Sequence, residues 1–340
     1  MTDGQRLHVA GEPDHVHGKL QDALYEIKRV IVGQDAMLER VMVCLLGNGH
    51  LLLEGVPGLA KTLTIRTLAG VLGGKFQRVQ FTPDLVPSDL IGTRIYRADS
   101  HSFDTELGPI FCNFLLADEI NRAPAKVQSA LLEVMQEQQV TIGPKTYKLD
   151  SPFIVMATQN PIESEGTYPL PEAQMDRFMM KVVVDYPSFG DEMEVVGRSL
   201  ADPVDVNEIM TAKEVVSFQR AVGAIYVDRP VSEYAVALTM ATRNPGAFGR
   251  GDLMEYISFG ASPRGSINLV KSARALALTR GRRYVLPSDV HELAKDALRH
   301  RIVLSYEGLA SGISSDDILD AVLEAVPVPR VELSTSSSSA

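Results

Sequence analysis

A glycine-rich turn between an apolar run and a helical pattern constrains this fold more than any other segment. The run His50–Glu54 leads into Gly55-Val-Pro-Gly-Leu-Ala-Lys61-Thr62, and apolar residues then recur at helical spacing from Leu63. A strand that turns into a helix through such a loop points backbone N–H groups at phosphate oxygens. Lys61 adds a positive charge there, and Thr62 offers a hydroxyl to Mg²⁺. The sequence therefore predicts a nucleotide-phosphate site in an α/β fold.

Two adjacent acids follow a second apolar run. Residues 110–117 are mostly apolar and end in Asp118 and Glu119, which is typical of a buried parallel strand. Open α/β sheets bind ligands at the carboxyl ends of their strands, so we expect Asp118 to hold Mg²⁺ and Glu119 to polarise the attacking water. Alternatively, the two acids could only supply charge to the first turn of the next helix. The phosphate loop upstream favours the catalytic interpretation.

Further strands and two more polar residues follow the same pattern. We expect additional strands at 76–81, 113–117, 153–157 and 181–185, and their alternation with helical segments predicts a mostly parallel sheet. Asn160, after the 153–157 strand, could orient the attacking water or only start a turn. Arg177, before the last strand, could be a charge at a helix end or a guanidinium that serves a neighbouring subunit.

Two inserts interrupt this domain. One is Gly92–Leu107; the other is Gln139–Leu149, which alternates apolar and polar residues around Gly143-Pro144 and predicts a hairpin. Tyr96, Phe103 and Tyr147 lie in them and could either contact a protein client or pack locally. A plain phosphate-loop kinase has no use for either insert.

The chain changes character beyond Pro187. Helical spacing or cap signals dominate, with segments at 192–200, 212–224, 231–242, 262–279, 287–299 and 316–325. We therefore expect a flexible leader at 1–18, an α/β domain at 19–188, a helical domain at 189–330 and a disordered serine-rich tail at 331–340.

Composition narrows the class of partners. Lys plus Arg is 33 and Asp plus Glu is 43, which gives a formal charge of −10 and disfavours nucleic-acid coating.

No apolar run reaches the length of a membrane span, and the first residues lack a signal-peptide pattern. Cys44 and Cys112 lie in apolar stretches, as expected of reduced, buried thiols. We expect a cytoplasmic protein.

With these motifs in place, the chain resembles the AAA+ ATPases, and among them the MoxR family, from about Lys19 to Arg330. The matching segments are 55–62, 118–126, 157–163, 168–178 and 260–265. Ala60 stands where the strict phosphate-loop pattern has glycine, and it looks usual for that family. The resemblance implies a parallel AAA+ sheet with a helix-2 insert and a pre-sensor hairpin, followed by an all-helical lid domain.

The resemblance also implies roles for individual residues toward ATP and Mg²⁺. It makes Thr62 and Asp118 metal ligands, Glu119 the catalytic base, Asn160 the first sensor and Arg177 an arginine finger supplied in trans. Arg264 becomes the second sensor from the lid, although its position in a Ser-Pro turn also fits an ordinary helix start. The residues expected to contact the nucleotide are Val32, Gly33, Gly55, Val56, Pro57, Gly58, Leu59, Ala60, Lys61, Thr62 and Leu63.

The family further implies a homo-oligomeric ring, a hexamer in our interpretation, that remodels or matures a client protein complex, with a von Willebrand factor A domain protein as adaptor. Two alternatives remain open at this point. One is a motor subunit of metal-chelatase type, and the other is an ATP-gated interaction module with little turnover. A GTPase lacks support because no Asn-Lys-x-Asp motif occurs in the sequence.

Overall fold

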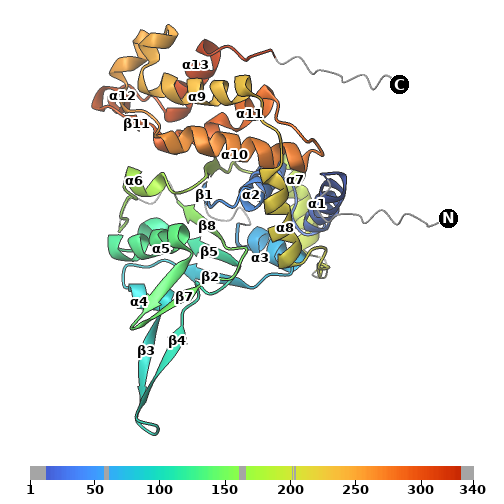
Figure 1. Cartoon of the computed structure of the whole chain (residues 1–340), viewed down its shortest axis with the longest axis vertical. Coiled ribbons are helices and arrows are strands. Elements are labelled where there is room, and N and C mark those ends of the chain that lie inside the picture. Colours follow the sequence, from blue (N-terminus) through green and yellow to red (C-terminus); the bar gives the residue numbers. More distant parts are fainter. Residues whose placement is uncertain (1–12, 57–60, 161–165, 201, 203, 331–340) are drawn as a thin grey trace, which may run out of the picture. The chain divides into compact units, whose positions relative to one another are not determined.

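The computed structural model describes residues 13–56, 61–160, 166–200, 202 and 204–330 (Figure 1). The chain divides into two compact units between Gly223 and Ala224. The predicted leader segment 1–12 and tail 331–340 lie outside the described residues.

The first unit is built on a five-stranded sheet in which every neighbouring pair is parallel. Its order is β2-β5-β8-β1-β9. The bounds are β1 (Leu51–Glu54), β2 (Phe76–Gln80), β5 (Phe114–Asp118), β8 (Ile154–Gln159) and β9 (Met180–Val183). The predicted parallel sheet is thus confirmed, with strand ends that differ by one or two residues.

Helices cover both faces of this sheet (Figure 1). Helix α5 (Ala125–Glu137) packs on one face, where alternate strand residues such as Leu115 and Ala117 join its Leu131 in one apolar core. Helix α3 (Lys61–Val71) lies on the opposite face. Burial from both sides explains why the three central strands, β5, β8 and β1, read as mainly apolar runs in the sequence.

The first helix, α1 (Pro13–Lys28), begins inside the predicted leader. Val16, Leu20, Ala23 and Ile27 are fully buried and recur at helical spacing, so they form one apolar stripe. Residues 13–18 therefore belong to the folded unit, and the expected boundary at residue 18 is corrected to the start of this helix.

Two helices beyond the predicted boundary at residue 188 belong to the first unit. They are α7 (Phe189–Ser199) and α8 (Ala212–Gly223). Arg198 on α7 donates to the carbonyls of Lys28 and Arg29, at 3.0 and 2.7 Å, and Gln219 on α8 donates to the carbonyl of Leu45 at 2.7 Å. These contacts place the division after α8, because both helices are bonded to the ends of α1 and α2 (Asp35–Leu46).

Both inserts are antiparallel hairpins. The first pairs β3 (Gly92–Arg97) with β4 (Ser102–Leu107) and extends away from the sheet; the second pairs β6 (Gln139–Ile142) with β7 (Lys145–Lys148), as predicted (Figure 1). Gly143 turns the second hairpin at a positive φ of 60°, where a Cβ would lie 2.5 Å from the Arg94 side chain. The remaining short helices of this unit are α4 (Pro87–Ile91), η1 (Ile120–Arg122) and α6 (Glu172–Met175).

The second unit is mainly helical, as expected. Its helices are α9 (Arg229–Arg243), α10 (Pro263–Thr279), α11 (Pro287–Leu298), α12 (Tyr306–Ala310) and α13 (Ser315–Ala325), with 3₁₀ turns η2 (Pro245–Phe248), η3 (Gly251–Glu255) and η4 (Arg299–Arg301). A two-stranded pair, β10 (Ile257–Phe259) and β11 (Val303–Leu304), joins two of its loops.

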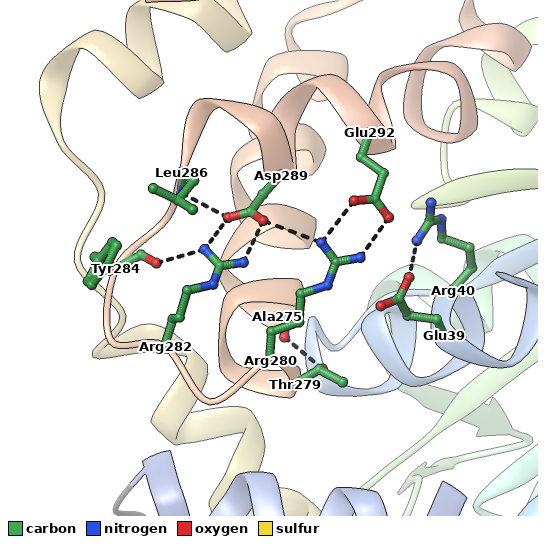
Figure 2. Close-up of polar contacts among 10 residues, drawn as sticks. All are labelled: Glu39, Arg40, Ala275, Thr279, Arg280, Arg282, Tyr284, Leu286, Asp289 and Glu292. Atoms are coloured by element: carbon green, nitrogen blue, oxygen red, sulfur yellow. Dashed lines mark hydrogen bonds and ion pairs between the residues drawn. The ribbon is translucent and has the colours of Figure 1, made fainter. Parts of the chain in front are cut away.

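A buried aspartate fixes the turn between α10 and α11 (Figure 2). The Asp289 carboxylate accepts from both terminal nitrogens of Arg282, at 2.7 and 2.6 Å, and from the backbone N–H of Leu286 at 2.8 Å. Arg280 lies 3.8 Å from the same carboxylate and is bidentate to Glu292, with both contacts at 2.8 Å. Asp289 is thus fully paired, which a buried charge requires.

Across the described ranges, none of the helices has both the length and the apolar character needed to cross a bilayer.

Candidate functional site

The candidate site lies at the carboxyl ends of three adjacent strands of the first unit. Strand β1 ends at Glu54 and leads into Gly55, β5 ends at Asp118, and β8 leads into Asn160. The parallel register pairs Leu53 with Thr158 and Ala117 with Ala157, so these ends are level with one another. The topology therefore brings together residues that are far apart in the chain, such as Gly55 and Asn160.

Only part of the phosphate loop is described. Gly55 and Val56 precede the gap, Pro57, Gly58, Leu59 and Ala60 lie outside the described residues, and α3 begins at Lys61. Thr62 and Leu63 therefore lie in the first turn of this helix, whose free backbone N–H groups favour an anion.

The Lys61 ammonium lies between the loop and the acids. Its Nζ donates to the carbonyl of Gly55 at 2.6 Å. Burial lowers the pKa of Lys61, and the carboxylates of Asp118, Glu119 and Glu54 oppose that shift. A partly desolvated cation close to several carboxylates is the electrostatic arrangement expected at a phosphate site.

Both oxygens of the Asp118 carboxylate are engaged. The Thr158 hydroxyl donates to Oδ1 at 2.6 Å, and Nε and Nη2 of Arg78 lie 3.1 and 2.7 Å from Oδ2. The hydroxyl of Thr158 also accepts the backbone N–H of Glu119 at 2.8 Å. One threonine therefore fixes the positions of both acids, because a hydroxyl can donate and accept at the same time.

Glu119 has an unusual backbone and a constrained side chain. Its φ is 55°, in the left-handed region that residues with a side chain rarely adopt. Its Oε2 accepts from Nε2 of Gln80 at 2.7 Å and lies 3.1 Å from Nη1 of Arg122. Left-handed residues other than glycine concentrate at functional sites, which supports Glu119 as a candidate catalytic residue.

Asn160 lies beside this site at the end of β8, whereas Arg177 precedes β9, whose first residue, Met180, is in register with Leu51 at the start of β1. Asn160 is buried just beyond β8, next to segment 161–165, which lies outside the described residues. Arg177 follows α6 and precedes β9, the last strand of the sheet order, and its side chain is half-buried.

The segment predicted to line the adenine pocket lies between α1 and α2. Gly33 and Gln34 have positive φ values of 62° and 57°, and a Cβ on Gly33 would lie 2.9 Å from Cγ of Asp191 at the start of α7. Gln34 donates to the carbonyl of Asp185 at 3.4 Å. Val32 therefore belongs to a turn that touches the segment after β9, and a side chain at position 33 would have to adopt a positive φ and displace the Asp191 carboxylate.

Arg264 belongs to the second unit, at the exposed start of α10. The Ser262 side chain caps this helix by accepting the N–H of Arg264 at 3.1 Å. Two glycines flank the motif for steric reasons: a Cβ on Gly260 would lie 2.3 Å from the carbonyl of Thr242, and one on Gly265 would lie 2.8 Å from Leu298. The motif therefore packs the start of α10 closely against α9 and α11.

Sequence reasoning did not identify Arg78, Gln80 or Thr158 as site residues. Arg78 and Gln80 are alternate residues of β2, so they share one face, and Gln80 is in register with Asp118. The polar residues of this strand, Gln77, Arg78 and Gln80, were an available signal. These polar residues matter because β2 lies next to β5, which ends at Asp118, and only the sheet order reveals that neighbour.

The residues present fit a magnesium ion bound together with a nucleotide. Within the described ranges there is no group of three or more His, Cys, Asp or Glu side chains that could hold a metal by itself. Mg²⁺ typically takes one or two protein oxygen ligands and completes its shell with water and phosphate. Asp118 and Thr62 supply oxygen donors of that kind, a carboxylate and a hydroxyl.

Comparisons with known proteins agree with this geometry. Residues 50–180 match the model of the ATPase family associated with various cellular activities, and residues 253–322 match that of the AAA lid domain. Chaperone MoxR1 of Mycobacterium tuberculosis is 54% identical over 92% of this chain and 83% of its own. Protein MoxR of Methylorubrum extorquens is 32% identical over 89% and 93%. The crystal structure of an inferred ATPase from Cytophaga hutchinsonii superposes with a TM-score of 0.89 at 47% identity, and covers 94% of this chain and 97% of its own.

Proposed function

Because the chain belongs to the MoxR family of AAA+ ATPases, we propose that it hydrolyses ATP with Mg²⁺ in a hexameric ring and uses this reaction to remodel a client protein complex. The chain is an ATPase with a helical AAA lid domain. The observation that carries the proposal is the convergence of Lys61, Asp118 and Glu119 at the carboxyl ends of β1 and β5.

In this proposal the phosphate loop and α3 bind the nucleotide. The segment 55–60 contacts the phosphates, through backbone N–H groups at its positions other than Pro57, and Lys61 exchanges the Gly55 carbonyl for phosphate oxygens. Thr62 and Asp118 hold the Mg²⁺, which neutralises charge on those oxygens when bound. Leu63 and the turn at Val32 and Gly33 contact the remainder of the nucleotide.

Glu119 serves as the base that accepts a proton from the attacking water. Its contacts with Gln80 and Arg122 are both made by Oε2, so the water can approach Oε1 while these two partners hold the side chain. Thr158 keeps the backbone of Glu119 in place throughout, and Asn160 orients the water from the end of β8. Apart from the proton transfer to Glu119, these roles are positioning, which supplies most of the catalysis in phosphoryl transfer.

The ring completes the site in this proposal. Arg177 precedes the edge strand β9, where a neighbouring subunit can approach, so we assign it to the next subunit's nucleotide. Arg264, as the second sensor, is drawn with the lid toward the phosphates of bound ATP. Hydrolysis then requires assembly, since neither subunit holds both the base and the finger of one site.

The two hairpins are the proposed contacts to the client. On β3–β4, Tyr96 and Phe103 are exposed, their rings pack 5.3 Å apart, and the Arg94 guanidinium lies 4.4 Å from the Phe103 centroid. Tyr147 on β7 instead packs edge-on against Phe111, which favours the local packing interpretation for that residue. A von Willebrand factor A domain adaptor and a cytoplasmic site of action complete the proposal, the latter supported by two buried free thiols.

The test is the Glu119→Gln variant. It keeps the shape and the Gln80 contact but removes the base, so ATP binding should persist while hydrolysis is lost. Crosslinking this variant in ATP, followed by sizing and identification of the copurified protein, measures both ring size and client. Hydrolysis at the wild-type rate would contradict the assigned base.

A further inference from the structure

Arg78 contacts both acids of the candidate site, one directly and one through a single side chain. Besides the two contacts to Oδ2 of Asp118, its Nη2 donates to Oε1 of Gln80 at 2.8 Å, and Nε2 of Gln80 donates to Oε2 of Glu119 at 2.7 Å. A guanidinium Nη2 carries two hydrogens, one for each acceptor. Two side chains of β2 thus link Asp118 to Glu119.

The sheet explains why this contact forms. Arg78 and Gln80 lie on the same face of β2, and the parallel register places Gln80 opposite Asp118. Strand β2 is the other edge of the sheet, and 46% of the Arg78 side chain is exposed, against 17% for Asp118. A half-exposed ion pair at a sheet edge adds little to folding stability. The contact between Arg78 and Asp118 can therefore break without unfolding the domain.

The charges around Asp118 bear directly on metal binding. The Arg78 guanidinium occupies Oδ2 and the Thr158 hydroxyl occupies Oδ1, so a cation that binds either oxygen must displace or share with one of them. The Thr158 hydroxyl is neutral and can stay close to a metal-bound carboxylate. The guanidinium repels a divalent cation, and that repulsion is strong at short range in a partly desolvated site.

We propose that Arg78 is a positioning residue that holds Asp118 and, through Gln80, Glu119 in place before nucleotide binds, and that it weakens Mg²⁺ binding by competing for Oδ2 of Asp118. This inference rests on the proposed role of Asp118 as a Mg²⁺ ligand. Departure of Arg78 from Asp118 removes the donor that orients the Gln80 amide, so it also loosens the contact that holds Glu119.

The test uses the full chain and a fluorescent, non-hydrolysable ATP analogue. Its affinity is measured in EDTA and over a Mg²⁺ titration for wild type, Arg78→Gln and Arg78→Met. We expect unchanged affinity in EDTA and a Mg²⁺ midpoint that falls about threefold to tenfold once the charge is removed. Arg78→Lys, which retains the charge, should stay close to wild type.

Arg97→Gln is the matched control. It removes the same charge from an arginine that also pairs with an aspartate, Asp104 at 3.3 Å, but on the β3–β4 hairpin. Its Mg²⁺ midpoint should equal that of wild type. A similar fall in Arg97→Gln would overturn the proposal, because the effect would then reflect net charge rather than competition at Asp118.

Two further results would overturn it. An unchanged Mg²⁺ midpoint in both Arg78→Gln and Arg78→Met means that Arg78 does not compete with the ion. Weaker binding of the analogue in EDTA means that Arg78 contacts the nucleotide itself. The Asp118→Asn variant separates this proposal from the one on which it rests. If its Mg²⁺ midpoint equals that of wild type, Asp118 is not a Mg²⁺ ligand, and the proposed function is wrong at that residue whatever Arg78 does.

Discussion

Two arginine–aspartate pairs of this chain have nearly equal contact distances and very different surroundings. Arg78 and Asp118 meet at 2.7 Å with 46% and 17% of their side chains exposed, and Arg282 and Asp289 meet at 2.6 Å with 20% and 1% exposed. The Asp289 pair also caps a helix start through Leu286, whereas the Asp118 pair lies at a sheet edge beside candidate catalytic residues. Nearly equal distances therefore accompany two different roles: burial makes one pair part of the fold, and partial exposure leaves the other exchangeable.

This comparison predicts that changes to proposed catalytic residues affect turnover more than stability. Arg177→Ala should lower the ATPase rate about a thousandfold, or about 4 kcal/mol in activation free energy, with nearly normal nucleotide binding. Steady-state turnover and analogue binding measure the two effects, with Arg97→Ala as the control. Mixed rings of wild-type and Arg177→Ala subunits should lose activity according to neighbour statistics. Unchanged turnover in the pure variant would exclude a shared site.

At Asp289 we expect a loss of folding stability rather than a loss of turnover. Asp289→Ala removes the partner of Arg282 and the acceptor for the Leu286 N–H, so it should lower the free energy of unfolding of the second unit by about 3 to 4 kcal/mol. Denaturant unfolding measures this loss. Asp252→Ala, which breaks an exposed pair with Arg250, is the control and should cost much less, because solvent screens an exposed ion pair. Equal losses in both variants would show that burial does not separate the two kinds of pair.

The buried, neutral imidazole of His50 makes the free energy of unfolding depend on pH. Burial lowers the pKa of His50 from 6.5 to about 4, while its Nδ1 accepts the N–H of Val155 and its other ring nitrogen contacts the Met135 carbonyl. The unfolded imidazole takes up its proton near pH 6.5 and the folded one near pH 4. The stabilisation is therefore complete above pH 6.5 and falls by about 3 kcal/mol as the pH drops to 4.

The measurement is the pH dependence of unfolding for His50→Gln against wild type. The variant should be less stable at neutral pH but should lose less stability between pH 6.5 and 4. His101→Asn, at an exposed hairpin position, should retain the wild-type slope. Identical slopes in wild type and His50→Gln would contradict the role of this histidine.

The smallest effect is expected for the stability of Arg78 variants. Arg78→Gln should change the free energy of unfolding by less than about 1 kcal/mol, because a half-exposed ion pair contributes little. Thermal unfolding without nucleotide measures it. A loss as large as that of Asp289→Ala would mean that both pairs are structural, and the contrast between them would fail.

The local parts of the site could be read from the sequence, and the contacts between them could not. The segment 55–62, the acids Asp118 and Glu119 and the hairpin at 139–149 each carry their signal within a few neighbouring residues. The start of α1 was missed because the burial of the apolar stripe from Val16 to Ile27 depends on the residues it packs against. The continuation of the first unit through α8 was missed because the hydrogen bonds of Arg198 and Gln219 join segments that are far apart in the sequence.

The sequence by itself determined the strand-to-helix phosphate loop, the acid-tipped strand and the helical second unit, since periodicity and turn chemistry act between near neighbours. Only the tertiary structure decided that Arg78 and Gln80 hold the two acids and that Asp289 is buried with Arg282. The first decision depends on the register of parallel strands about forty residues apart in the chain, and the second on the packing that excludes water from one carboxylate.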